Sequence, residues 1–268
     1  MIRLTDREFH DIVTFVRDRY GINLVNKRQL IEARLYSVLS EKGLSSFSDY
    51  FRIIQGNEST EIVTLLNKLT TNHTYFMREP AHFEFLKQTI LPYHDKHNTQ
   101  KCIRIWSAGC SSGEEAFTAE MYIQDYFGPQ EALWDTRILA SDISLKAMEA
   151  AKTMLYTEEL LKDVPHAWKR RYFIKQKDGR YALSNEVRDK VLFRRFNLMD
   201  RFFFPQPFDL IFCRNVMIYF DQPTKNMLVN KFYDVLKPGG YLFIGHSETI
   251  QREASKFQYV QPAIYRKE

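Results

Sequence analysis

A turn rich in small residues joins two apolar segments within residues 103–118, which read IRIWSAGCSSGEEAFT. β-Branched and aromatic residues precede this turn, and apolar residues at helical spacing follow it, so the pattern predicts a strand, a tight turn and a helix. Gly109 and Gly113 allow the backbone to turn sharply and to approach a ligand, beside the unpaired N–H groups that open the helix. The stretch therefore favours a site for a nucleotide-like ligand.

The residues of this turn limit which ligand it can hold. It contains neither the Gly-x-Gly-x-x-Gly of dinucleotide sites nor the Gly-Lys-Ser/Thr of a phosphate loop. Glu114 and Glu115 open the helix and would repel a pyrophosphate. S-adenosylmethionine, which carries a sulfonium and an ammonium group and no phosphate, suits the turn better. A small-residue turn with two helix-capping carboxylates is the alternative interpretation of this stretch by itself.

Polar side chains also lie just beyond the other strands that the sequence predicts. Strands are expected at 102–106, 137–141, 191–196 and 209–213. The polar residues that follow them are Glu115, Asp142, Asn197, and Arg214 with Asn215. Open α/β sheets bind ligands at this edge, and an acid after the second strand can accept hydrogen bonds from a ribose diol. Their recurrence at successive strands strengthens the nucleotide-like interpretation.

The elements that must position these residues alternate between strand and helix from residue 101 onward. Such alternation predicts a parallel sheet with crossover helices, that is, an α/β fold. Helices are expected at 145–152 and 224–236, and a fifth strand at 241–245. An Asp-Gly turn predicts a hairpin within 172–183, which interrupts the alternation, and a second hairpin is expected at 257–266.

Residues 1–70 show only helical patterns. Thr5 and Glu8 have the spacing of a capping box, and further helices are expected at about 27–42, 48–55 and 60–69, so this part predicts a small bundle. Polar residues then crowd 71–80 before Pro80, which suits the first turn of the next helix. For this segment by itself, turn and capping residues or a solvated arginine are sufficient explanations.

Composition sets further limits. The chain has 268 residues, 44% of them hydrophobic and 26% charged, as in a globular protein with a large core. It has no apolar run near the ~20 residues of a membrane span and no signal-peptide pattern, so we expect a cytoplasmic protein. The three cysteines lack metal-ligand spacing, so we expect reduced thiols and no metal.

Charge is unevenly distributed along the chain. The formal net charge is +5, yet residues 169–195 alone carry ten Lys/Arg against three Asp/Glu. A solvated surface and a site for an acidic partner are both consistent with such a cluster.

Six longer motifs occur along the chain: TTNHTYFMRE at 70–79, IWSAGCSSGEE at 105–115, ASDI at 140–143, FCRNVMIYF at 212–220, LKPGG at 236–240 and GHSE at 245–248. In type and order they resemble the motifs of a known family, the CheR chemotaxis methyltransferases. These bacterial enzymes use S-adenosylmethionine to esterify glutamates on chemoreceptors. The resemblance implies a helical N-terminal domain (1–70), a linker with a first helix (71–100), and a Rossmann-like methyltransferase domain (101–268) with a small antiparallel β-subdomain near 166–190.

The resemblance also implies roles for individual residues. The cofactor-binding residues it implies are Asn72, Thr74, Arg78, Gly109, Glu115, Asp142, Asn197, Leu198, Arg214 and Asn215. Glu115 would hold the methionine ammonium, Asp142 the ribose hydroxyls, and Asn197 with Leu198 the adenine edge. Arg78 and Tyr219 would flank the methyl group and the incoming glutamate, and S-adenosylhomocysteine would be the product.

A glutamate side chain is already ionised at neutral pH. Methyl transfer to it therefore needs alignment more than proton removal, and we expect no general base. Family members that dock tightly on a receptor tail peptide carry a Gly-x-Gly insertion in the β-subdomain turn. Residues 177–180 read KDGR and lack it, so we expect no dependence on such a peptide. The second helix also has fewer arginines than usual for the family, with Arg34 the clearest one present.

Two other functions remain as alternatives. A nucleic-acid methyltransferase would explain the basic segment, but residues 212–215 (FCRN) supply neither the Asn/Asp-Pro-Pro-Tyr/Phe loop nor the Pro-Cys nucleophile of such enzymes. A non-catalytic module that binds the cofactor or the receptors is the second alternative, and the presence of both Arg78 and Tyr219 argues against it. We expect chemoreceptors as partners, no nucleic acid, no membrane insertion and a monomer.

Overall fold

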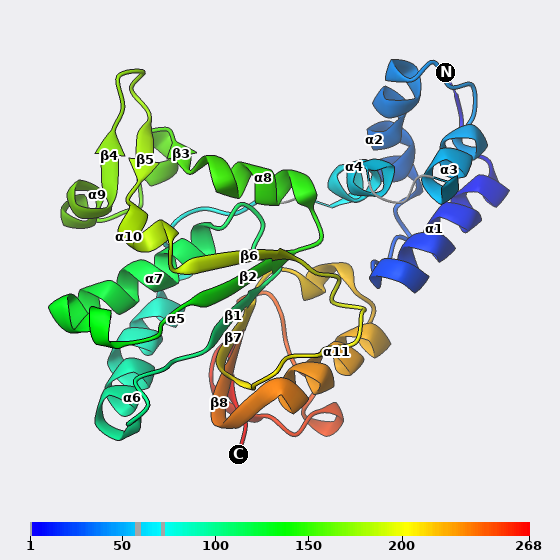
Figure 1. Ribbon diagram of the computed structural model, residues 1–268. Coiled ribbons are helices and arrows are strands. Elements are labelled where there is room, and N and C mark those ends of the chain that lie inside the picture. The colour runs from blue at the N-terminus through cyan, green and yellow to red at the C-terminus, as the bar shows by residue number, and fades with distance from the viewer. Residues whose placement is uncertain (1, 57–59, 71–72) are drawn as a thin grey trace.

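The computed structural model describes residues 2–56, 60–70 and 73–268, and it consists of a helical bundle followed by a sheet flanked by helices (Figure 1). The helices of the bundle are α1 (Asp6–Tyr20), α2 (Arg28–Glu41), α3 (Phe47–Gly56) and α4 (Thr60–Leu69). The predicted capping box is confirmed: Glu8 N donates to Thr5 Oγ1 at 3.3 Å, and Thr5 N donates to Glu8 Oε2 at 3.0 Å. Among the described residues, no helix combines the length and apolar character needed to cross a membrane.

The described part of the chain forms a seven-stranded sheet in the order β6-β2-β1-β7-β8-β10-β9. The strands are β1 (Ile105–Ala108), β2 (Ile138–Asp142), β6 (Val191–Arg195), β7 (Phe208–Cys213), β8 (Leu236–Ile244), β9 (Gln258–Gln261) and β10 (Ile264–Arg266). Strands β6, β2, β1, β7 and β8 run parallel, and the hairpin β9–β10 joins antiparallel to β8. The α/β prediction and the closing hairpin are confirmed.

Helices cover both faces of the sheet (Figure 1). One face carries α5 (Pro80–Phe85), the π-helix η1 (Leu86–Ile90), α6 (Leu91–His97) and α7 (Glu114–Phe127), and the other carries α11 (Gln222–Val235). Successive strand side chains point to opposite faces, so Trp106 packs with Phe232 of α11, whereas Ile105 belongs to the cluster that contains Phe117 of α7.

A small subdomain lies apart from this sheet (Figure 1). It contains β3 (Leu155–Tyr156), α9 (His166–Tyr172), β4 (Phe173–Lys175), β5 (Tyr181–Leu183) and α10 (Asn185–Arg188). The helix α8 (Leu145–Thr153), which contacts β2 and β6 of the main sheet, precedes it in the chain. The expected small antiparallel β-subdomain is confirmed, and its predicted hairpin is β4–β5. The short β3, which pairs with β5 as the third strand, was not predicted.

Some predicted boundaries were wrong. The first strand was expected at 102–106 but occupies Ile105–Ala108, because Arg104 N donates to the side chain of Asp209 in β7 at 2.8 Å instead of to a backbone carbonyl of that strand. The fifth strand was expected at 241–245 but begins at Leu236, because Leu236 already pairs with Phe208 of β7 before the regular pairing resumes at Tyr241. A register shift between Phe208 and Leu210 accommodates residues 237–240.

Candidate active site

A cavity lies at the carboxyl ends of β1, β2, β6 and β7, with about 1010 Å³ of empty space including its open mouth. The site residues expected from the sequence that line it are Thr74, Arg78, Gly109, Glu115, Asp142, Asn197, Leu198, Arg214, Asn215 and Tyr219. Asn72 lies outside the described residues. The structure thus brings the described candidates to one cavity and leaves their individual roles as predictions.

The glycines of the β1–α7 turn are required by its shape. Gly109 has φ +86° and Gly113 has φ +95°, a left-handed conformation that favours glycine. A Cβ atom on Gly109 would lie 2.4 Å from Val216 Cγ2, and one on Gly113 would lie 2.8 Å from the Phe193 ring. The turn therefore packs closely against the loop after β7 on one side and against β6 on the other.

Asp142, at the end of β2, is held by the backbone around it. Its Oδ2 accepts from Ser111 N and its Oδ1 from Ser144 N, each at 2.8 Å. Burial raises the pKa of the Asp142 carboxyl, and these backbone donors counteract part of that effect. Each carboxylate oxygen keeps a further lone pair, so the group can still accept hydrogen bonds from a diol in the cavity.

The two acids that open α7 have different surroundings. Glu115 lines the cavity; its Oε1 accepts from Ser107 Oγ at 2.7 Å and its Oε2 from Arg214 Nη1 at 3.2 Å. Glu114 accepts instead from Ser112 Oγ at 2.8 and 3.0 Å. Burial raises the pKa of Glu115, and the Arg214 charge opposes that rise. A cation bound in the cavity would stabilise the ionised form of Glu115 further.

Arg214 connects this wall of the cavity to the segment that precedes α5. Its side chain is 2% exposed, and its guanidinium lies 5.2 Å from the centre of the Phe83 ring. Nε and Nη2 both donate to Glu79 Oε2 at 3.2 Å, and Nη2 also donates to the Arg78 carbonyl. Arg214 is therefore shared between two carboxylates, Glu79 and Glu115.

Glu79 is the last residue of the motif at 70–79, but the sequence predicted no role for it. It precedes α5 with φ 55°, and its Oε1 accepts from Asn215 Nδ2 at 3.3 Å and from His246 N at 3.4 Å. Burial by itself would raise the pKa of this carboxyl, but the Arg214 charge and these donors lower it instead. Glu79 is thus ionised at neutral pH.

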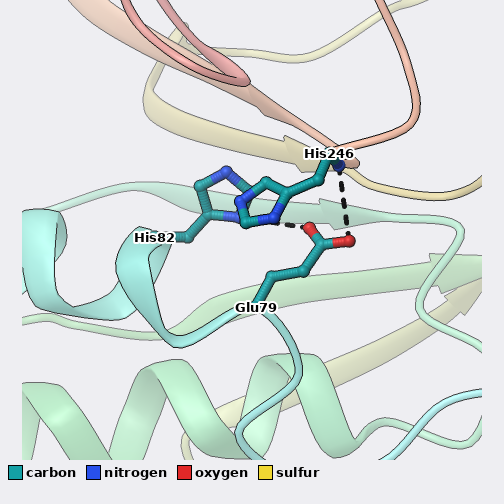
Figure 2. A group of neighbouring side chains, drawn as sticks. All are labelled: Glu79, His82 and His246. Atoms are coloured by element: carbon teal, nitrogen blue, oxygen red, sulfur yellow. Dashed lines mark hydrogen bonds and ion pairs between the residues drawn. The ribbon is translucent and has the colours of Figure 1, made fainter.

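Glu79, His82 and His246 form a cluster in which both imidazoles lie beside the carboxylate (Figure 2). His82 is fully buried, its Nδ1 is 3.5 Å from Glu79 Oε2, and burial lowers its pKa to about 3. One carboxylate and two imidazoles can bind a divalent cation. Here, however, Glu79 Oε2 already accepts two N–H groups of Arg214, whose charge would repel a cation. We therefore assign the cluster to positioning of the loops around the cavity.

Tyr219 is placed by a loop whose backbone N–H groups converge on Glu248. The Glu248 carboxylate accepts from Gly245 N at 2.6 Å, from Asn215 N at 2.9 Å and from Ile218 N at 3.1 Å. Asn215 has φ 60°, which bends the chain into the 3₁₀-helix η4 (Met217–Tyr219). This buried acid fixes the loop after β7, which carries both Asn215 and Tyr219.

The helical bundle also reaches the cavity, which the sequence did not predict. Tyr20 and Ile22 line it. Asn197 Nδ2 donates to the Arg19 carbonyl at 2.8 Å, and Asn23 N donates to the Tyr219 carbonyl at 2.7 Å. Tyr20 and Ile22 belong to no recognisable motif, because they reach the cavity only through the packing of the helical bundle against the sheet domain.

Arg34 and Arg78 make backbone contacts in the structure. Arg34 donates to the carbonyls of Lys68 and Thr70 at 3.0 and 3.2 Å, and so joins α2 to the end of α4. Arg78 is half-buried at the cavity wall, where its Nη1 donates to the His73 carbonyl at 2.7 Å.

Comparison with known proteins identifies the family to which this chain belongs. Residues 72–265 match the family described as CheR methyltransferase, SAM binding domain, and residues 7–70 match CheR methyltransferase, all-alpha domain. The chain is 41% identical over 272 residues to the chemotaxis protein methyltransferase of Borreliella burgdorferi, covering 99% of this chain and 96% of that protein. It is 35% identical to the chemotaxis protein methyltransferase of Escherichia coli, covering 98% and 92%.

The fold, the cavity and the matched domain define an S-adenosylmethionine-dependent methyltransferase of the Rossmann-like α/β class, with a small antiparallel β-subdomain and a preceding all-α domain. Within that class, the chain belongs to the CheR methyltransferase family. The expected cofactor, S-adenosylmethionine, is confirmed by the match to the SAM binding domain of that family.

Proposed function

We propose that this enzyme transfers the methyl group of S-adenosylmethionine to glutamate side-chain carboxylates of chemoreceptors in chemotactic adaptation. The observation that carries the proposal is that one cavity is lined by Glu115 and Asp142 together with Arg78 and Tyr219. The chain aligns with nearly the whole length of the two relatives named above, and both are chemotaxis protein methyltransferases. This similarity supports the same substrate class.

The cofactor is oriented in this proposal by the ends of the strands. Glu115 binds the methionine ammonium and Asp142 binds the ribose hydroxyls, while Asn197 and Leu198 contact the adenine edge. Gly109 lets the backbone approach the cofactor. Asn72 and Thr74 contribute from the linker, and the product is S-adenosylhomocysteine.

The chemistry needs alignment of an existing nucleophile. A glutamate carboxylate is ionised at neutral pH, and an oxygen of it displaces the sulfide from the sulfonium methyl group. Arg78 orients the incoming carboxylate by its charge, and Tyr219 places it beside the methyl group. No proton is removed in this step, so the mechanism has no general base.

The substrate partner is the cytoplasmic helical bundle of a methyl-accepting receptor, and the enzyme acts on it as a cytoplasmic monomer. The β4–β5 turn at 177–180 lacks the insertion associated with tight binding of a receptor tail peptide. We therefore propose that methylation does not depend on such a peptide, and that no nucleic acid takes part.

The decisive experiment is methyl transfer from labelled S-adenosylmethionine to membranes that contain the organism's chemoreceptors. The expected result is label on a receptor that mild base releases as methanol, which identifies a carboxyl methyl ester. Base-stable label would overturn the glutamate assignment and point to nitrogen or nucleic-acid substrates. Cofactor binding without any label would favour a non-catalytic module.

A further inference from the structure

The GHSE motif at 245–248 directly follows β8, and the proposed function gives it no role. Its last residue, Glu248, is 7% exposed, and its side chain reaches from the end of β8 to the loop after β7. Glu248 N donates to the Gly245 carbonyl at 2.9 Å, so a tight turn ties the acid to the end of its strand. The sheet therefore supports Glu248, whereas the loop that it contacts carries residues that line the cavity.

One carboxylate contacts both ends of that loop. Glu248 Oε2 accepts from Asn215 N at 2.9 Å, and Oε1 accepts from Ile218 N at 3.1 Å. The first N–H groups of a helix have no partner within the helix, and Ile218 belongs to the first turn of η4. Tyr219 follows Ile218 directly, so the carboxylate that fixes Asn215 also fixes the backbone beside Tyr219.

This set of donors suits a carboxylate. Burial raises the pKa of Glu248, and the backbone N–H groups of Gly245, Asn215, Ile218 and Met217 oppose that rise. Both oxygens of a carboxylate accept hydrogen bonds, whereas a carboxamide presents an NH₂ group on one side. A glutamine at this position would therefore lose its bonds to one end of the loop and leave a buried N–H group there unpaired.

The end of β8 and the loop are also in close contact. A Cβ atom on Gly245 would lie 2.5 Å from Asn215 Nδ2 and 2.9 Å from Asn215 N. On another side the loop meets the helical bundle, where Asn23 N donates to the Tyr219 carbonyl at 2.7 Å. Groups outside the loop thus hold the backbone on both sides of the Tyr219 side chain.

We propose that Glu248 is a positioning residue for the methyl-transfer step, which sets Tyr219 against the incoming carboxylate by bonding the backbone that precedes it. The proposed cofactor contacts after β1, β2 and β6 lie on other segments, so this role concerns the rate of transfer more than cofactor binding. The inference rests on the proposed place of Tyr219 beside the methyl group.

The first test separates the rate of transfer from cofactor binding. Glu248→Gln keeps the size of the side chain and removes one acceptor oxygen. We expect kcat for receptor methylation to fall about 30-fold, because small displacements of aligned groups are costly. The dissociation constant of S-adenosylmethionine, measured by calorimetry on the full chain, is expected to change less than about threefold. Unchanged kcat, or equal losses in kcat and in cofactor affinity, would overturn the proposal.

A double-mutant cycle with Tyr219→Phe tests whether Glu248 acts through Tyr219. Tyr219→Phe removes the hydroxyl and keeps the ring. In that background Glu248→Gln is expected to lower kcat less than about fivefold, because the group that it positions is already absent. A disturbance unrelated to Tyr219 would lower kcat by the same factor in both backgrounds, and that result would overturn the proposal.

Two further variants control for stability. Glu8 is a buried acid of the helical bundle that likewise accepts from backbone N–H groups, those of Thr5 at 3.0 Å and Ser48 at 2.8 Å. Glu8→Gln is therefore expected to lower the urea midpoint and leave kcat unchanged. Glu248→Asp keeps two acceptor oxygens on a shorter side chain and is expected to retain more of kcat than Glu248→Gln. If Glu248→Gln does not fold, Glu248→Asp carries the same double-mutant comparison.

Amide hydrogen exchange distinguishes this inference from the function on which it rests. In Glu248→Gln, peptides that cover 214–220 are expected to exchange faster than in the wild type, whereas Glu8→Gln leaves them unchanged. Unchanged exchange in Glu248→Gln would refute the hold on the loop, whatever the activity. A wild-type protein that methylates no receptor would refute the substrate assignment, and full kcat in Tyr219→Phe would refute the role of Tyr219 and the present inference with it.

Discussion

The cavity and the three-stranded subdomain both contain arginine–carboxylate pairs, but in opposite surroundings. In the cavity, the Arg214 side chain is 2% exposed and bonds to two acids from different segments of the chain. In the subdomain, the Arg180 side chain is 50% exposed and pairs with Asp178, two residues away in the same turn. Exposed pairs of the second kind contribute little, whereas a buried charge is costly unless it is fully paired.

This difference shows that the density of charge along the chain does not locate the cavity. Residues 169–195 carry the densest positive charge, and part of it is paired. Two of these pairs are local, Arg180–Asp178 and Arg188–Asp189, and two reach acids outside the segment, Lys190–Glu131 and Lys169–Glu158. The charges that shape the cavity come from single residues after separate strands. Burial and partners, rather than charge density, distinguish the two regions.

The largest effect is expected from breaking the buried pairs. Arg214→Met leaves Glu79 and Glu115 without their common counter-charge, so the free energy of unfolding is expected to fall by about 3–5 kcal/mol. Urea unfolding at pH 7 measures this loss. The matched control, Arg180→Met at the exposed turn, is expected to leave the unfolding midpoint nearly unchanged, and similar midpoints for the two variants would contradict the comparison.

A smaller effect, on the reaction rather than on the fold, is expected from Arg78. Arg78→Ala removes the charge that orients the incoming carboxylate, so kcat is expected to fall about 100-fold while the affinity for S-adenosylmethionine changes less than about threefold. Receptor methylation and cofactor titration measure the two quantities. Arg137→Ala, which removes an exposed arginine paired with Asp135, is the control. Unchanged turnover in Arg78→Ala would rule out the orienting role.

The lowered pKa of buried His82 makes the free energy of unfolding depend on pH. Its pKa is about 3 in the folded protein and about 6.5 in an unfolded chain, so the unfolded state binds more protons between these values. Stability is therefore lost as the pH falls below about 6.5, at a rate approaching ~1.4 kcal/mol per pH unit.

The His82 contribution is isolated by comparison with His82→Phe, which keeps a ring against Phe243 but cannot be protonated. Urea unfolding at pH 7 and pH 5 is expected to show a smaller acid loss in this variant than in the wild type. If the free energy of unfolding falls equally in the two proteins between pH 7 and pH 5, the pKa of His82 is not lowered in the folded state.

The smallest effect is expected at the subdomain turn. Arg180→Gln breaks an exposed local pair with Asp178, so the melting temperature and the rate of receptor methylation are expected to stay as in the wild type. A synthetic receptor tail peptide is likewise expected to bind neither protein in calorimetry. Tight binding of that peptide by the wild type would show that the turn at 177–180 is sufficient without the insertion.

Much of the fold could be predicted from the sequence because its signals are local. The alternation of apolar strands and helices, the capping box at Thr5 and the Asp-Gly turn at 178–179 each depend on residues close together in the chain. The two residues of β3 carry no such pattern; they become a strand only because β5 lies beside them.

The same distinction applies to the candidate site. Glu115, Asp142 and Asn197 were predicted because each follows a recognisable strand, and the parallel sheet brings strand ends together. Glu79, His82 and Tyr20 gave no comparable signal, since their importance comes from contacts with residues distant in sequence, such as Arg214.

Residues 19–23, which are the last two residues of α1 and the three that follow it, contact both ends of the loop system around the cavity. Their backbone accepts a hydrogen bond from Asn197, where we place the adenine, and donates one to the carbonyl of Tyr219, where we place the methyl group. The same five residues thus contact both the proposed adenine subsite and the proposed methyl-transfer position. A displacement of the helical bundle relative to the sheet would therefore alter both positions at once.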